Sequence, residues 1–168
     1  NSEILGRFPH HYIPNGLDTT VFKPYKKQEA RAYFNLPQNK KIILFVADSL
    51  EDKRKGFVYL QDALRYLDAE SVLLITLGNG KIDDTLFPSK CLGFISDPLQ
   101  IAMAYSAADV FVIPSIEDNL PNSVMESIAC GTPVVGFNIG GIPDMIRHGE
   151  NGFLATLGDS IDLAQKVN

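Results

Sequence analysis

The polar residues that could do chemistry are concentrated in residues 114–126, between an apolar segment and a helix-like one. Pro121 suits the first turn of a helix, because its missing N–H costs little there. The backbone N–H groups of Asn122 and Ser123 would then face outward at the helix end, where the helix dipole favours an anion. Glu126 lies one turn further on the same face, and its carboxylate could accept hydrogen bonds from a vicinal diol such as a ribose. The pattern predicts a site for a phosphorylated ligand that carries a diol.

A second charged group, Asp52-Lys53-Arg54-Lys55-Gly56, precedes the helix predicted from residue 57. Its three cations oppose the dipole of that helix and lower local stability unless an anion offsets the charge. Gly56 allows the backbone to approach a ligand or another loop closely. Two interpretations stay open for this group, a diphosphate-binding loop and a solvated surface run.

Composition narrows the function classes. The chain has 168 residues, 45% of them hydrophobic, which is enough for one domain with a sizeable core. The net charge of -5 argues against nucleic acid as a partner. No apolar run approaches the roughly 20 residues of a membrane span. Cys91 and Cys130 fit buried thiols in a reducing compartment, and His10, His11 and His148 lack the spacing of a metal site.

Apolar patterning predicts an α/β domain. Strands are expected at 42–46, 72–77, 90–95, 110–113, 133–136 and 152–155, with helices at 27–36, 57–67, 98–108, 121–130, 142–147 and from 159 onward. A further short strand is expected at Tyr12-Ile13-Pro14. This alternation predicts a single Rossmann-like domain with an open, mostly parallel sheet flanked by helices. Such sheets bind ligands beyond the carboxyl ends of their strands, where residues 47–55 and 114–121 form loops.

Residues 114–135 resemble the signature of the family-4 retaining glycosyltransferases, also called group 1, which have the GT-B fold of two Rossmann-like domains. The matching residues are Pro114-Ser115, Asp118, and Glu126-Ser127-Ile128-Ala129-Cys130-Gly131-Thr132-Pro133-Val134-Val135, with seven residues between Asp118 and Glu126. Further matches follow in the family's order: Ile13-Pro14-Asn15-Gly16-Leu17-Asp18 with Phe22, Lys55-Gly56, Leu77-Gly78-Asn79-Gly80, Leu92-Gly93-Phe94-Ile95, Gly140-Gly141-Ile142-Pro143 and Gly149-Glu150-Asn151-Gly152.

The resemblance implies a role for each matching position. Lys55 would neutralise the donor diphosphate as it leaves, and Asp118 would lie near the transferred sugar as the first acid of a pair. Glu126, the second acid, would bind the ribose diol. The remaining donor contacts are assigned to the backbones of Leu120, Asn122 and Ser123, to the backbone of Ile95 at the base edge, and to Ser115 nearby.

The chain departs from the family pattern at two charged positions. The first acid of the pair is usually Glu in this family, and here Asp118 holds the position, with Glu117 beside it. An arginine that the family carries seven residues before the glycine of the lysine-glycine pair is replaced by Ser49. Either Arg54 or Lys53 is expected to supply the missing charge.

The resemblance predicts half of an enzyme. Residues 1–24 would link to an N-terminal domain that carries the acceptor site, and residues 25–168 would form the nucleotide-sugar-binding domain, cut short at its C-terminus. The reaction would transfer a sugar from a UDP- or GDP-sugar to an acceptor hydroxyl with retention and without a metal cofactor. We expect a cytoplasmic protein with at most peripheral membrane contact. A GT-B nucleotide-sugar epimerase and a non-enzymatic flavodoxin-like domain remain as alternatives.

Overall fold

A parallel six-stranded sheet forms the centre of the computed structural model, which describes residues 15–80 and 87–168. The strand order is β3-β2-β1-β4-β5-β6, and every pairing in it is parallel. The strands are β1 Lys41–Ser49, β2 Val72–Asn79, β3 Ser89–Cys91, β4 Val110–Ile113, β5 Val134–Phe137 and β6 Gly152–Ala155. The single Rossmann-like domain predicted from the sequence is therefore present.

The chain order reverses direction across the sheet between β1 and β4. From β1 the chain moves outward to β2 and β3, and then returns to the other side of β1 with β4, β5 and β6. Doubly wound sheets bind ligands at such a reversal, in the crevice outside the carboxyl ends of the strands. The two loops picked out by their chemistry follow β1 and β4 at this reversal: residues 50–55, because β1 extends to Ser49, and residues 114–121.

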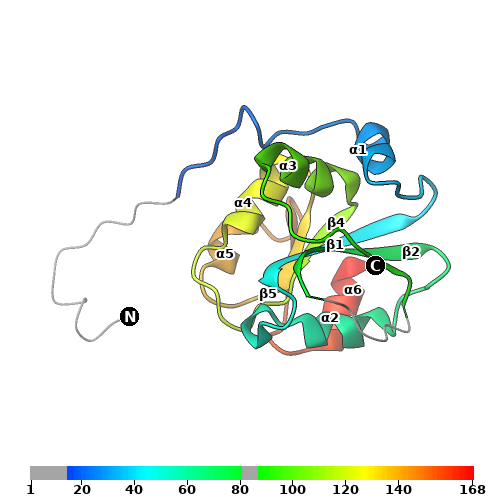
Figure 1. Cartoon of the computed structure of the whole chain (residues 1–168). Coiled ribbons are helices and arrows are strands. Elements are labelled where there is room, and N and C mark those ends of the chain that lie inside the picture. The colour runs from blue at the N-terminus through cyan, green and yellow to red at the C-terminus, as the bar shows by residue number, and fades with distance from the viewer. Residues whose placement is uncertain (1–14, 81–86) are drawn as a thin grey trace, which may run out of the picture.

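Helices cover both faces of the sheet (Figure 1). They are α1 Lys27–Tyr33, α2 Phe57–Leu64, α3 Pro98–Ala107, α4 Asn122–Ala129, α5 Ile142–Met145 and α6 Ser160–Val167. Residues of α1, α3, α4 and α5 bury one apolar cluster with Ile42 and Leu44 of β1. Residues of α2 and α6 bury a second cluster with Ile43 and Phe45, so alternate residues of β1 serve opposite faces.

Several element boundaries differ from the predictions. The strand expected at 90–95 ends at Cys91, and Gly93 then adopts a positive φ of 76° that turns the chain. The helix expected over 57–67 ends at Leu64, but hydrogen bonds of the tighter i to i−3 kind continue to Leu67. Pro121 does not lie inside α4: its ψ of 119° is extended, and the helix begins at Asn122.

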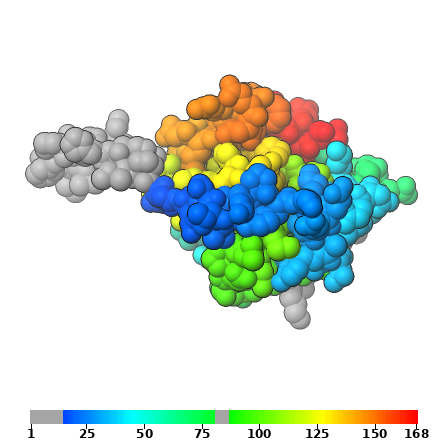
Figure 2. Space-filling model, turned by 90° about the horizontal axis from the view of Figure 1, so that it is seen from above, coloured from blue at the N-terminus to red at the C-terminus, as the bar shows by residue number. Residues whose placement is uncertain are grey.

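The described part of the predicted linker lies against the domain. The Asn15 side chain donates a hydrogen bond of 2.8 Å to Asn122 Oδ1, and Phe22 packs against the first apolar cluster. Figure 2 shows this blue segment lying across the green and yellow surface to which α3 and α4 contribute. The strand predicted at Tyr12-Ile13-Pro14 lies outside the described residues. In the described ranges, no helix is both long and apolar enough to cross a bilayer.

Candidate functional site

The loop after β1 presents Lys55 at the end of a short 3-10 helix, Lys53–Lys55. Asp52 caps this turn by accepting a hydrogen bond from the backbone N–H of Arg54 at 3.0 Å. Gly56 closes it in the left-handed conformation, with φ of 68°, and α2 begins at the next residue. The sequence thus projects Lys55 from a tight turn, which restricts the directions its side chain can take.

Gly56 also holds this turn against the loop after β4. A Cβ atom on Gly56 would overlap with the carbonyl group of Pro114, so only glycine fits. The backbone N–H of Ile116 donates a hydrogen bond of 2.9 Å to the carbonyl oxygen of Arg54. Close backbone packing therefore joins the two loops that flank the crevice.

Lys55 and Asp118 meet across these loops. Lys55 Nζ lies 3.0 Å from Asp118 Oδ2, and the side chains are 30% and 14% exposed. Glu117, the neighbouring acid, is exposed and makes no ion pair with a described residue. Asp118, and not Glu117, is therefore the acid that pairs with Lys55, and the two side chains form a partly exposed ion pair between the loops that follow β1 and β4.

Two glycines support the other side of the Asp118 loop. A Cβ on Gly140 would overlap with the Asp118 carbonyl, and one on Gly141 with the Asn119 carbonyl. The N–H of Gly141 donates to the Asp118 carbonyl oxygen at 3.4 Å. A Gly141 Cβ would also lie 3.0 Å from Leu120 Cδ2. The sequence flagged this glycine pair only by resemblance, and the structure supplies its physical reason.

The start of α4 has the features of an anion site. Pro121 occupies the N-cap position without a side-chain cap, and its carbonyl accepts from the N–H of Val124 at 3.1 Å. The backbone N–H groups of Asn122 and Ser123 donate to no described residue. They lie at the positive end of the helix dipole, next to the Asp118 loop in the chain.

Glu126 is tied to α3. Its Oε2 atom accepts a hydrogen bond of 3.0 Å from the hydroxyl of Tyr105, and its Oε1 atom has no partner among the described residues. Burial raises the pKa of Glu126 above its ordinary value, while the hydrogen bond from Tyr105 opposes that rise. The Tyr105 contact was missed in the sequence, because nothing in the spacing of Tyr105 and Glu126 marks them as neighbours.

Other predicted residues are placed less directly. Ser115 is fully buried, and its Oγ atom has no hydrogen-bond partner in the described ranges. The guanidinium group of Arg54 pairs with Asp52 at 2.8 Å instead of reaching the Lys55–Asp118 pair. Ser49, where the family carries an arginine, accepts locally from the N–H of Glu51 at 3.3 Å. Ile95 is partly buried and packs against the apolar cluster that α3 and α4 help to form.

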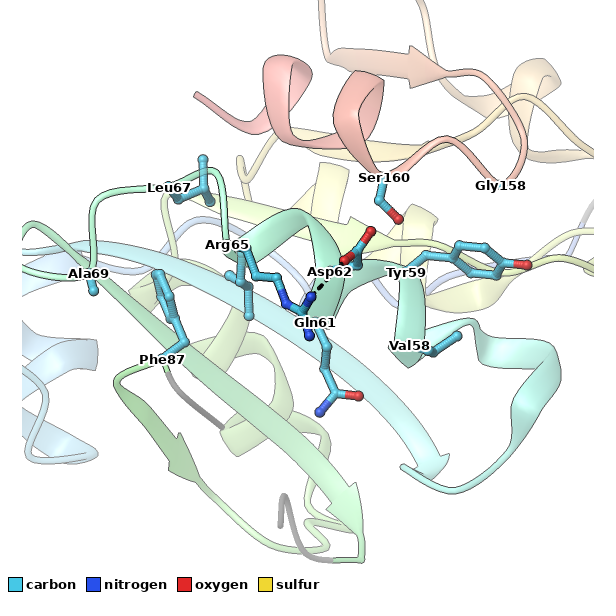
Figure 3. A pocket seen from close by; sticks show the side chains of 11 residues that line it. Val58, Tyr59, Gln61, Asp62, Arg65, Leu67, Ala69, Phe87, Gly158 and Ser160 are labelled. Carbon is cyan, nitrogen blue, oxygen red and sulfur yellow. Dashed lines mark ion pairs between the residues drawn. The ribbon is translucent and has the colours of Figure 1, made fainter. Parts of the chain in front are cut away.

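A large cavity lies elsewhere. A groove of about 710 Å³ runs between α2 and the start of α6, on the face opposite α4 (Figure 3). Its wall is largely apolar, and the ion pair it carries, Arg65 with Asp62 at 3.6 Å, is well exposed. We place the candidate site at the crevice because the convergent polar groups are there, while the groove offers volume without them. No group of three or more His, Cys, Asp or Glu residues suited to a metal occurs in the described residues.

The fold is a doubly wound α/β domain. Around its switch point it carries the cation Lys55, the acids Asp118 and Glu126, and the start of α4, whose first backbone N–H groups have no described partner. Residues 40–168 match the family described as group 1 glycosyl transferases, and this chain belongs to that family.

Comparison with individual proteins agrees with this assignment. The chain is 30% identical to the D-inositol 3-phosphate glycosyltransferase of Mycolicibacterium smegmatis, covering 91% of this chain and 38% of the relative. It is 23% identical to the N-acetyl-alpha-D-glucosaminyl L-malate synthase of Bacillus anthracis, covering 92% and 42%. The chain therefore spans less than half the length of these relatives.

Solved structures show the same domain inside larger proteins. Sucrose-phosphate synthase from Thermosynechococcus elongatus superposes with a TM-score of 0.81 at 28% identity, covering 92% of this chain and 41% of that one. Anabaena HepE, solved in complex with UDP-glucose, superposes with a TM-score of 0.79 at 25% identity, covering 92% and 45%.

Proposed function

We propose that this chain is the donor-binding half of a retaining glycosyltransferase, which moves a sugar from a UDP- or GDP-sugar to an acceptor hydroxyl. The observation that carries the proposal is the Lys55–Asp118 pair at 3.0 Å, held by backbone packing at the carboxyl edge of the sheet. Similarity to HepE, which was solved with UDP-glucose and with UDP, supports a nucleotide-sugar donor.

The donor diphosphate would bind between Lys55 and the start of α4. In the free protein Asp118 supplies the negative charge beside Lys55. A diphosphate carries more charge than one carboxylate, and the backbone N–H groups of Asn122 and Ser123 would add charge-assisted hydrogen bonds on its other side. As the bond to the sugar breaks, negative charge grows on the leaving diphosphate, and these groups would stabilise it.

The sugar and nucleoside would occupy the two ends of the same crevice. Asp118 and the backbone of Leu120 would contact the transferred sugar, with Ser115 beneath them. Glu126 would accept hydrogen bonds from the ribose diol, and the backbone of Ile95 would meet the base edge. Arg54 or Lys53 would contribute cationic charge near the phosphates, since Ser49 cannot.

The acceptor and the second wall of the crevice would come from an N-terminal domain. Closure of two domains would exclude water from the reacting groups. We propose that the reaction needs no bound metal, because Lys55 and the helix start supply the charge. Cytoplasmic location and at most peripheral membrane contact remain part of the proposal.

Binding of nucleotides by the chain tests the function. Calorimetric titration with UDP, GDP and ADP should show weak but measurable affinity for one of the first two, and no sugar transfer to any acceptor. Binding of none of the three would contradict the proposal, and detectable transfer by this chain would contradict its need for a second domain. Epimerisation or hydrolysis of the donor without acceptor, followed by NMR, would favour a GT-B epimerase instead. A flavodoxin-like domain without enzymatic function would bind no nucleotide.

A further inference from the structure

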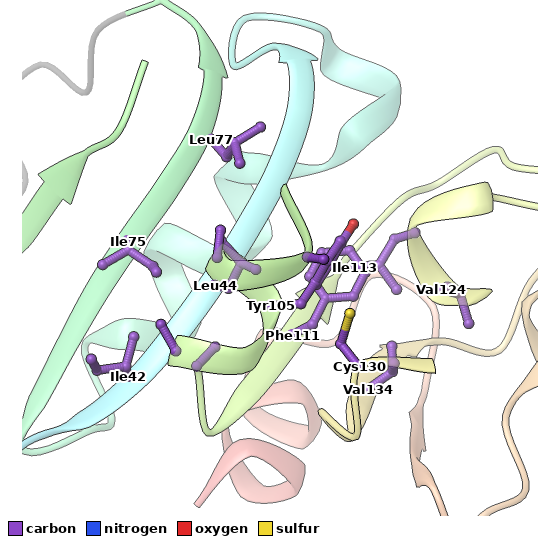
Figure 4. Packing of buried hydrophobic residues seen from close by; sticks show 14 of the residues in the cluster. Ile42, Leu44, Ile75, Leu77, Tyr105, Phe111, Ile113, Val124, Cys130 and Val134 are labelled. Atoms are coloured by element: carbon purple, nitrogen blue, oxygen red, sulfur yellow. The ribbon is translucent and has the colours of Figure 1, made fainter. Parts of the chain in front are cut away.

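Tyr105 is the one large side chain among the buried residues of α3. The other buried residues of this helix are alanines and a serine: Ala102, Ala104, Ser106 and Ala107. The Tyr105 ring is completely buried and meets Phe111 edge-on, with ring centroids 5.5 Å apart. In Figure 4 the Tyr105 ring lies inside the apolar cluster, and its hydroxyl oxygen is the red atom at the end of the side chain. Packing alone would be satisfied by phenylalanine, so the hydroxyl calls for another explanation.

The Tyr105 hydroxyl is directed at Glu126. It donates to Oε2 of that carboxylate at 3.0 Å from another helix, 21 residues earlier in the chain. A buried hydroxyl is costly unless it is hydrogen-bonded, and a carboxylate is a stronger acceptor than a neutral group. The hydroxyl thus occupies one oxygen of Glu126 and leaves Oε1 without a described partner.

A second set of hydrogen bonds fixes the backbone on both sides of this contact. Thr132 Oγ1 donates to the carbonyl oxygen of Tyr105 at 2.7 Å, and Ser127 Oγ donates to the carbonyl oxygen of Thr132 at 2.9 Å. Ser127 is the residue after Glu126 in α4. The backbones that carry the hydroxyl and the carboxylate are therefore cross-linked by buried hydrogen bonds, which limits their relative movement.

We propose that Tyr105 is a positioning residue for Glu126: its hydroxyl fixes the carboxylate plane so that Oε1 faces the ribose hydroxyls of the donor. This inference rests on the proposed function, because it needs a diol at Glu126. Without the hydroxyl, the glutamate side chain would sample several rotamers and lose part of its preorganisation for the diol.

A pair of nucleotides and a double-mutant cycle test the role. The probe is whichever of UDP and GDP binds more tightly, together with its 2′,3′-dideoxyribose analogue. Tyr105→Phe should weaken the ribonucleotide about five- to tenfold, as the cost of ordering one freed side chain on binding predicts, and should change the dideoxy analogue less than about twofold. In a Glu126→Ala background, Tyr105→Phe should cause no further loss.

Tyr25→Phe is the matched control. The Tyr25 hydroxyl also donates within the fold, to the carbonyl oxygen of Val21 at 3.0 Å, but does not contact Glu126. This variant should bind both nucleotides as the unmodified chain does. Equal weakening of both nucleotides by Tyr105→Phe, no weakening at all, or the same loss in the Glu126→Ala background would overturn the positioning role alone. An unmodified chain that binds neither UDP nor GDP would overturn the proposed function, and the inference with it.

Discussion

Lys55 and Asp118 are 63 positions apart in the chain, yet their side chains form an ion pair of 3.0 Å between the loops that follow β1 and β4. Both loops rise from strands at the point where the sheet reverses its order. Under the proposed function, Lys55 would exchange this carboxylate for a phosphate of the donor, with the first backbone N–H groups of α4 as further donors.

Asp118→Asn should keep nucleoside-diphosphate binding or strengthen it by up to about fivefold. The substitution removes the carboxylate that competes with phosphate for Lys55, and partly exposed pairs contribute roughly 0.2–1 kcal/mol. Calorimetry with UDP and GDP measures the effect. Binding weakened more than about threefold would show that Asp118 orients Lys55 for the phosphate, rather than competing with it.

Binding of the ribose diol should weaken as pH falls through the raised pKa of Glu126, that is, above the ordinary value of 4.5. The charged carboxylate accepts the diol, and burial makes that form harder to reach. The groups that face Glu126 stay neutral there, because burial raises the pKa of Tyr105 further above its ordinary value and that of Cys130 to about 12. Affinity measured from pH about 4 to about 8 should show this step, and Glu126→Gln should remove it.

The same shift has the opposite consequence for folding. A carboxyl whose pKa is raised in the folded state binds more protons there than in the unfolded chain, so the stability it contributes is lost as pH rises through the folded pKa. Denaturant unfolding of the unmodified chain and of Glu126→Gln should therefore differ least at low pH and most above the raised pKa. If the difference in unfolding free energy between the two proteins grew as the pH fell, Glu126 would not be a buried carboxyl with a raised pKa.

Gly56→Ala should disrupt the crevice, whereas Gly149→Ala should not. Both glycines have positive φ, 68° and 83°, so each alanine costs about 1–2 kcal/mol for the left-handed backbone. Only Gly56 also faces a backbone group, the Pro114 carbonyl; a Cβ on Gly149 would meet nothing within 4 Å. Thermal unfolding should show the larger loss for Gly56→Ala, and this variant should also lose diphosphate affinity. Similar losses of thermal stability in the two variants would show that contact with the Pro114 carbonyl does not restrict residue 56.

Asp109→Ala should destabilise the fold by about 3 kcal/mol, because it leaves Arg31 buried without its carboxylate. Arg31 Nη2 lies 2.6 Å from Asp109 Oδ2, and the Arg31 side chain is only 5% exposed. Asp62→Ala is the control, since its pair with Arg65 is long, at 3.6 Å, and exposed. That variant should change the free energy of unfolding by less than about 1 kcal/mol. An equal loss in the free energy of unfolding in both variants would mean that burial of Arg31 does not add to the cost of removing its carboxylate partner.

Much of the fold was predictable because it follows from periodicity. Continuous apolar runs such as 110–113 correspond to a strand buried on both faces, and β4 and β6 have the predicted bounds. The predicted boundaries are wrong where tertiary packing and backbone conformation determine the end of an element. The strand expected through Ile95 stops at Cys91 because Gly93 turns the chain, and α4 begins after Pro121 because that residue is extended.

The site was predictable only as far as residue types and motif order carry it. The sequence selected Lys55, Asp118 and Glu126, and the structure brings the first two together. It could not show that Gly56 and Gly140 hold the Asp118 loop from two sides, because close backbone approach leaves no local pattern. Tyr105 was missed for a related reason: among alanines on α3 it looks like one more core residue, and its hydroxyl acquires meaning only beside α4.

The central claim is most directly tested by calorimetric titration of the unmodified chain, Lys55→Ala and Glu126→Ala with its preferred nucleoside diphosphate. Lys55→Ala should weaken the diphosphate roughly tenfold to a hundredfold but leave the nucleoside alone unaffected, as expected for a lost charge-assisted contact. Glu126→Ala should weaken both, because both carry the ribose. If neither substitution weakens binding of the diphosphate, the donor does not bind in this crevice.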